Sequence, residues 1–282
     1  MAEEENTLER LQEKVQVLSG EVETLQKAVT TQKKPWYKDA STLIALLALL
    51  FSFGTTYVSD RRTSAQDVEN RRAELRALLQ RLALLPRENA EIRQKYAQDS
   101  ASLSMLSGYL NQENAFLSRQ ASEIAKKLPK DSVSATELYA IALALQQSYN
   151  LNSSMEFLDR ALESSDDFND EIGVLRTKAN VLFVIGKPEA GRVEYQKALD
   201  IFSKYPGYDS FTKNSTHIWT ELAWAYSERS LGSMDLSDQH IANAEHLLSA
   251  LRPGPGTEQI KMQIAQAKSP EQEVTNPSLG LH

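Results

Sequence analysis

Cysteine is absent from this chain of 282 residues. Its absence excludes disulfides, zinc–thiolate sites and thiol nucleophiles, but it is compatible with both reducing and oxidising compartments. Positive charge is in deficit, because 31 Lys and Arg residues stand against 38 Asp and Glu residues and give a net charge of −7. Nucleic-acid binding normally needs a basic surface, so we expect no nucleic-acid partner.

The motifs of the common catalytic and metal-binding sites are also missing. The four histidines do not have the HExxH spacing, and no GxSxG, Walker or GxGxxG string occurs. The acidic cluster from Asp166 to Glu171 lacks the glycine and the distal glutamate of an EF-hand loop, so we expect it to begin a helix instead. We therefore expect no catalytic residue, no metal and no cofactor, and we expect that the protein is not an enzyme.

Strand-like alternation is nearly absent, and helical periodicity runs through most of the chain, which predicts an all-α fold. One stretch differs from the rest: Ala40 to Ser59 (ASTLIALLALLFSFGTTYVS) carries no charge. A helix of this length spans about 30 Å, the thickness of a bilayer's hydrocarbon core. We predict one transmembrane helix at residues 40–59; a buried core helix and a cleaved signal peptide are the alternatives. Aromatic and basic residues flank the stretch as expected membrane anchors: Trp36, Tyr37, Tyr57, Arg61 and Arg62.

The Lys and Arg residues are nearly balanced on the two sides of this stretch, so the positive-inside rule gives no orientation. A charged head of about forty residues is hard to translocate without a signal. We therefore expect a lipid bilayer as a partner and a bacterial inner membrane as the location, with the N-terminus cytoplasmic and the C-terminal domain outside.

Residues 1–32 carry a heptad pattern in which apolar residues alternate at spacings of three and four: Leu8, Leu11, Val15, Leu18, Val22, Leu25 and Val29. Val at one core position and Leu at the other favour a parallel two-stranded coiled coil. We therefore predict a coiled-coil head that forms a parallel homodimer. The alternatives are a helix that packs on another partner and a helix that lies on lipid.

The helical spacing of apolar residues within residues 61–129 predicts linker helices. The first is marked by Leu75, Leu78, Leu82 and Leu85 and is expected to end at Pro86, because proline lacks an amide donor. A short helix is expected around Glu91 to Ala97, and another from Leu103 to Leu128. The pattern is compatible with a hairpin packed on the next domain and with an extended stalk.

Residues 133–252 contain an internal repeat of three amphipathic helix pairs. The expected helices run from Ala135 to Tyr149, Ser153 to Ser164, Glu171 to Ile185, Pro188 to Ser203, Thr216 to Ser230 and Leu236 to Leu251. Small residues recur where the two helices of a pair must touch, and bulky residues recur beside them.

This pattern resembles the tetratricopeptide repeat. The best-matching strings are Trp219-x-x-Leu222-Ala223-x-x-Tyr226 and Gly186-x-x-x-Ala190-Gly191-x-x-x-Tyr195-x-x-Ala198. The resemblance implies an α-solenoid, a right-handed superhelical scaffold that binds a peptide or helix in a concave groove without catalysis. It assigns to the groove the residues Tyr139, Gln146, Gln147, Arg176, Asn180, Phe183, Thr220 and Trp224. Plain core packing is the alternative for the aromatic residues. A carboxylate clamp built on Arg176 and Asn180 is disfavoured, because the neighbouring repeats do not complete it.

The sequence thus predicts an N-terminal coiled coil, one transmembrane helix, linker helices, a tetratricopeptide-like domain and a flexible tail at residues 253–282. The expected function is that of a membrane-anchored scaffold that holds a protein or peptide partner. The alternative is a single-pass signal transducer that couples partner binding to pairing of the coil across the membrane.

Overall fold

The computed structural model describes residues 14–24, 26–27 and 40–269, with residues 40–64 described by their backbone alone. All secondary structure in these residues is helical, so the prediction of an all-α fold is confirmed. The chain divides into two units, Met1–Asp67 and Val68–His282.

The first unit contains a helix at residues 14–24 and the beginning of α2 (Ala40–Lys95). Among the predicted coiled-coil residues, Val15 and Val22 are 63% and 55% exposed, and Leu18 is half-buried. The other predicted coiled-coil residues lie outside the described ones: Leu8, Leu11, Leu25 and Val29. Pairing of the coil therefore stays a prediction.

The predicted membrane span needs a correction. In the part of the chain that the structure describes, no helix is long and apolar enough to cross a bilayer. The backbone of residues 40–59 is helical, but α2 does not end with the apolar run; it continues through the charged Asp60, Arg61 and Arg62 and is 56 residues long in total. The finding contradicts the transmembrane helix, the bilayer partner and the inner-membrane location. The side chains of the five expected anchors lie outside the described residues: Trp36, Tyr37, Tyr57, Arg61 and Arg62.

Pro86 does not end its helix, contrary to the prediction, and the short helix expected around Glu91 is the last part of α2. An ion pair spans the proline, because Arg81 Nη2 donates to Glu88 Oε2 at 3.0 Å. Leu82 and Leu85, in the turn before Pro86, are buried. Packing and the ion pair thus stabilise the helix where proline removes one backbone hydrogen bond.

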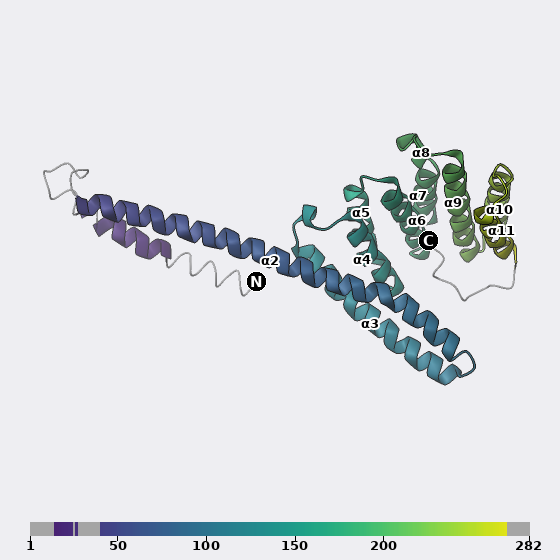
Figure 1. The fold of residues 1–282 in the computed structure, drawn as a ribbon, viewed down its shortest axis with the longest axis horizontal. Helices are drawn as coiled ribbons and strands as arrows, with labels where there is room; N and C mark the ends of the chain where they lie inside the picture. The colour runs from purple at the N-terminus through teal and green to yellow at the C-terminus, as the bar shows by residue number, and fades with distance from the viewer. Residues whose placement is uncertain (1–13, 25, 28–39, 270–282) are drawn as a thin grey trace. The chain divides into compact units, whose positions relative to one another are not determined.

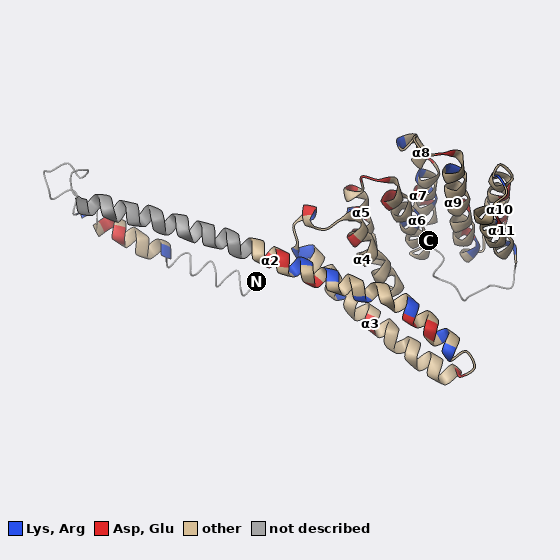
Figure 2. Ribbon diagram, in the orientation of Figure 1, with Lys and Arg blue, Asp and Glu red and all other residues tan. Residues whose placement is uncertain are grey.

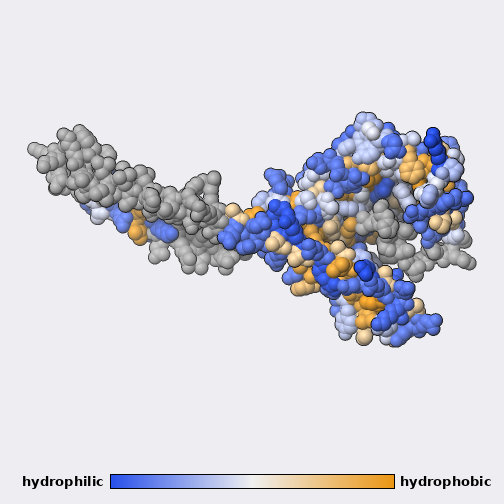
Figure 3. Space-filling model, in the orientation of Figure 1, coloured by the Kyte–Doolittle hydropathy of each residue, from blue (hydrophilic) through white to orange (hydrophobic). Residues whose placement is uncertain are grey.

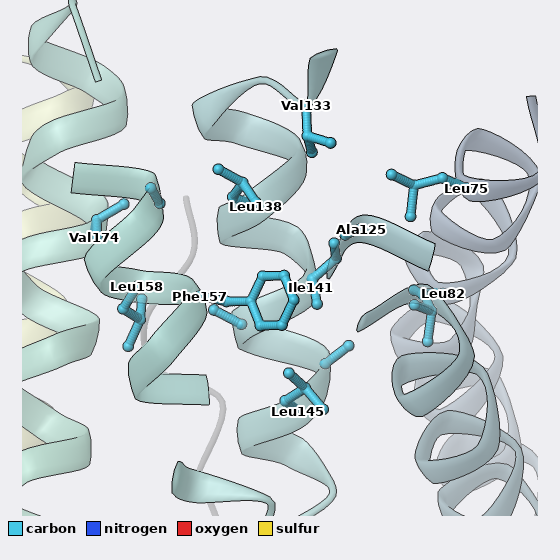
Figure 4. Packing of buried hydrophobic residues seen from close by; sticks show 14 of the residues in the cluster. Leu75, Leu82, Ala125, Val133, Leu138, Ile141, Leu145, Phe157, Leu158 and Val174 are labelled. Atoms are coloured by element: carbon cyan, nitrogen blue, oxygen red, sulfur yellow. The ribbon is translucent and has the colours of Figure 1, made fainter. Parts of the chain in front are cut away.

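Helix α3 (Ser100–Lys127) follows after a short turn and runs back along α2 as a hairpin (Figure 1). Arg81 of α2 donates to Glu113 of α3 at 2.6 Å. Leu82 of α2 and Ala125 of α3 share a buried cluster with Ile141 of the next helix (Figure 4). Of the two arrangements that the sequence left open, the structure has the packed hairpin.

Beyond a 3₁₀ turn (η2, Lys130–Ser132), helices lie at each position predicted for the three pairs (Figure 1). The first pair is α4 (Ala135–Gln147) and α5 (Leu151–Ser164), the second is α6 (Phe168–Val184) and α7 (Pro188–Leu199), and the third is α9 (Ser210–Ser230) and α10 (Met234–Ser249). A short α8 (Ile201–Lys204) follows the second pair, and α11 (Pro255–Lys268) packs on the third.

Polar side chains start the first helix of each pair. Ser134 accepts a hydrogen bond from the Glu137 amide at 3.2 Å, and the Ser134 amide donates to the Glu137 carboxylate at 2.9 Å. Asp167 and Asp209 cap α6 and α9 by accepting hydrogen bonds from backbone amides of the first turn, without a reciprocal bond. The acidic cluster at Asp166 to Glu171 therefore begins a helix, as predicted, and the Asp167 carboxylate satisfies the free Asp170 amide group.

The turns within the three pairs share one geometry. Tyr149, Gly186 and Gly232 occupy the same place and have φ of 58°, 75° and 79°. Each following amide donates to the carbonyl five residues back, as Asn150 does to Leu145 at 2.9 Å. This is a helix C-cap that normally uses glycine, so Tyr149 is the exception.

The second pair brings its helices close together at Gly191. A Cβ atom added there would lie 2.4 Å from the Phe183 ring and 3.0 Å from the Ala179 carbonyl oxygen. Gly191 is therefore required by contact between helices rather than by its backbone conformation.

We predict that Gly191→Ala lowers the free energy of unfolding by about 1–3 kcal/mol, because the added methyl group overpacks a closed contact. Chemical denaturation measures the change. Gly207→Ala is the control, since nothing lies within 4 Å of the added Cβ. Equal stability of both variants would contradict the close approach of α6 and α7.

The shared turn predicts opposite effects at equivalent positions. Gly186→Ala should lower the free energy of unfolding by about 1 kcal/mol, because a Cβ is strained at positive φ. Tyr149→Gly should raise the free energy of unfolding by up to about 1 kcal/mol. Thermal and urea unfolding of both variants measure this pair of changes. A marked loss of stability in Tyr149→Gly would show that the 82% exposed tyrosine ring stabilises the fold.

Candidate functional site

We define the first-helix face as the set of eight residues that the resemblance assigns to a groove. It lies on α4, α6 and α9, the first helices of the three pairs. Side-chain hydrogen bonds join α4 to α6: Gln146 Nε2 donates to Asn180 Oδ1 at 2.9 Å, the Tyr139 and Thr177 hydroxyls lie 2.9 Å apart, and the Thr136 hydroxyl donates to Asp170 Oδ1 at 3.0 Å. The structure thus brings the α4 and α6 members of the face together.

Arg176 joins the second pair to the third. Its Nε donates to the Thr220 hydroxyl at 2.9 Å, and its Nη2 donates to the Thr216 carbonyl at 2.6 Å. Burial lowers the pKa of Arg176 to about 10, which still leaves the guanidinium protonated at neutral pH. Because these bonds occupy Arg176 inside the protein, the structure gives no support to a carboxylate clamp.

Accessibility divides the first-helix face. Gln147 is exposed, whereas Tyr139, Gln146, Arg176 and Asn180 are half-buried. The remaining three are buried, with exposed fractions of 2% for Phe183, 0% for Thr220 and 9% for Trp224. These three side chains pack between neighbouring helices; for the two aromatic residues, this is the core-packing alternative.

Trp224 belongs to a buried network that the sequence reading missed. Its ring stacks on Tyr195 and His240 at centroid distances of 5.4 and 4.1 Å. Its Nε1 donates to Glu228 Oε1 at 3.0 Å. The Glu228 side chain is fully buried and also accepts two hydrogen bonds from Arg192, at 2.7 and 2.8 Å.

The Arg192–Glu228 contact ties α7 to α9 across 36 residues of sequence. The hydrogen bonds from Arg192 hold the pKa of Glu228 below its usual value, against the opposing effect of burial. No local sequence pattern reveals such a pair, because the two residues become neighbours only when the second and third pairs pack together.

Glu221 faces α10 rather than α4 or α6. Its carboxylate lies 2.6 Å from His240 Nδ1 and accepts from Asn243 Nδ2 at 3.3 Å. It borders a hollow of about 340 Å³ that also contains His217 and His246. Within the described part of the chain, no group of three or more His, Asp or Glu residues is placed to hold a metal ion.

No known protein family and no curated protein matches the sequence. The crystal structure of BtubC (BKLC) from P. vanneervenii shows a distant similarity, with 15% sequence identity and a TM-score of 0.26. The match covers 64% of this chain and 95% of that chain. A TM-score this low supports no conclusion about fold or function.

The buried carboxylate predicts a pH dependence of stability. Because the pKa of Glu228 is lower in the folded state than its usual value of 4.5, its stabilising effect is complete above that value. It is lost as the pH falls through the folded pKa, since the unfolded state takes up the proton first. We expect Glu228→Gln to lower the free energy of unfolding by about 2 kcal/mol at neutral pH. Below about pH 4.5, the stability of this variant should depend less on pH than that of the wild type.

Urea denaturation across this pH range measures the difference. Glu163→Gln is the matched control, because Glu163 is exposed and its ion pair with Lys130 spans 3.6 Å. Parallel pH profiles for the wild type and Glu228→Gln would rule out the proposed effect of Arg192.

Proposed function

We propose that this chain is a protein-interaction scaffold whose three helix pairs form a tetratricopeptide-like solenoid. The observation that carries the proposal is the repeated turn: Tyr149, Gly186 and Gly232 have matching backbone hydrogen bonds and positive φ. Equivalent turns between equivalent helices favour one structural unit used three times. Stacked helical repeats commonly present an extended surface to a partner protein.

The part of the first-helix face on α4 and α6 is where we place the partner. Gln147 is exposed there, and Gln146 and Asn180 are half-buried beside it. Carboxamide groups donate and accept hydrogen bonds as backbone amides do. Because Arg176 is occupied by Thr220 and Thr216, this surface suits the uncharged backbone of a peptide better than a terminal carboxylate.

We also propose that residues 1–32 pair in parallel with the same residues of a second copy. The support is the spacing of three and four in the sequence and the exposure of Val15 and Val22 in the single chain. Pairing would present two repeat domains together and raise the apparent affinity for a partner with two binding segments.

Site-specific photo-crosslinking in the source cells tests the binding surface. A photoreactive amino acid at position 147 should form a discrete crosslinked product with a partner protein, because this side chain is exposed on the first-helix face. The same amino acid at Asn152 is the matched control, since Asn152 is exposed on α5, the second helix of that pair. Adding Gln146→Arg should reduce the product at position 147. Identical products from positions 147 and 152, or none from either, would contradict the proposal.

A further inference from the structure

Helix α3 carries a row of large exposed side chains. Met105, Tyr109 and Phe116 are 56%, 62% and 63% exposed. Gln112, also exposed, completes a spacing of four, three and four. At about 100° of rotation per residue, the four side chains fall within about 60° of one another around the helix. We call these four residues the α3 stripe.

The α3 stripe lies on the side of the helix opposite its buried residues. Asn114, Ser118, Ala121 and Ala125 are buried on the other side, where Asn114 Nδ2 donates to the Ala144 carbonyl at 2.9 Å. The core of this chain therefore does not use the stripe. Large apolar side chains that recur on an outer helix face are typical of a surface that another helix covers.

Three of the four stripe residues lie on an uncharged part of α3, whereas Glu113 and Arg119 lie about one turn before and after Phe116. From Ser100 to Gln112 the sequence of α3 contains no Asp, Glu, Lys, Arg or His, and Figure 2 shows this end of the helix without charged residues. Figure 3 shows hydrophobic residues on the surface of the same hairpin. A strongly charged partner would find no counter-charge on residues 100–112 of α3, whereas a neutral helix with apolar residues at the same spacing would fit there.

We propose that the α3 stripe packs against the α3 stripe of a second copy of this chain. The copy meets each requirement: it is a helix, it is uncharged over the same residues, and its apolar residues have the spacing of a coiled-coil contact. A two-fold interface places the same patch on both subunits, so one stripe suffices to form it.

Two features of α3 suit such a pair of helices. Gln112 lies in the middle of the stripe, so it would lie near the two-fold axis, where its carboxamide can donate to and accept from its own counterpart. Gly108 lies one turn before it, and a Cβ added at Gly108 would meet nothing within 4 Å. The open space beside this glycine allows a second helix to approach closely.

Disulfide crosslinking of the full-length chain tests the interface, because the native sequence contains no cysteine. Gln112→Cys should form a covalent dimer under mild oxidation, measured by non-reducing electrophoresis. Ser104→Cys is the matched control, since Ser104 is exposed on α3 but turned about 100° away from the middle of the stripe. We expect roughly tenfold more dimer from Gln112→Cys, a difference equivalent to about 1.4 kcal/mol.

A second substitution separates this interface from pairing of the N-terminal coil. In the Gln112→Cys background, Tyr109→Glu should lower the dimer yield strongly, because it places two carboxylates in an apolar contact, while Tyr109→Phe should retain it. Leu18→Glu, which acts on the coil, should leave the preference for position 112 over position 104 intact. Equal yields at positions 112 and 104, no dimer from either, or a dimer insensitive to Tyr109→Glu would overturn the proposal. None of these outcomes affects the crosslinking test at position 147.

Discussion

The second unit of this protein depends on the close approach of paired helices, which small side chains at their contacts permit. Ala142 and Ala161 in the first pair, and Ala179 and Ala198 in the second, have no exposed surface. Gly191 extends the same principle, because no Cβ fits between α7 and the Phe183 ring. Once the helices are this close, each of the first two pairs still has an apolar side that the next pair buries, and α11 covers the third, so the pairs pack in chain order.

Polar contacts then fix how successive pairs are joined. Gln146 with Asn180 and Arg176 with Thr220 connect the first helices, and Arg192 with Glu228 connects α7 to α9. A buried carboxylate is costly unless it is paired, so the Glu228 contact strongly disfavours other arrangements of these helices. Three residues that were expected to face a partner are buried by this packing: Phe183, Thr220 and Trp224. The proposed binding surface is therefore limited to the residues on α4 and α6.

The α2–α3 hairpin covers the first pair, and its two sides have different properties. The inner side contributes Leu82 and Ala125 to the core shared with Ile141 (Figure 4). The outer side of α3 keeps Tyr109 and Phe116 exposed. A single helix can therefore complete the fold of one chain and offer a surface to a second chain.

Periodicity in the sequence determined the all-α class and the positions of the paired helices, because helical spacing and capping residues such as Asp167 act over a few neighbouring residues. The local sequence pattern was misleading where contacts between residues distant in sequence determine the structure. It predicted that a helix ends at Pro86, but the helix continues there and is stabilised by the Arg81–Glu88 ion pair and by buried leucines. It also predicted a membrane span that the described helices do not support. Only the tertiary structure decided that Trp224 is buried beside Glu228 and that α3 exposes its stripe. Exposure depends on which other elements cover a side chain, and residues far apart in the chain determine that packing.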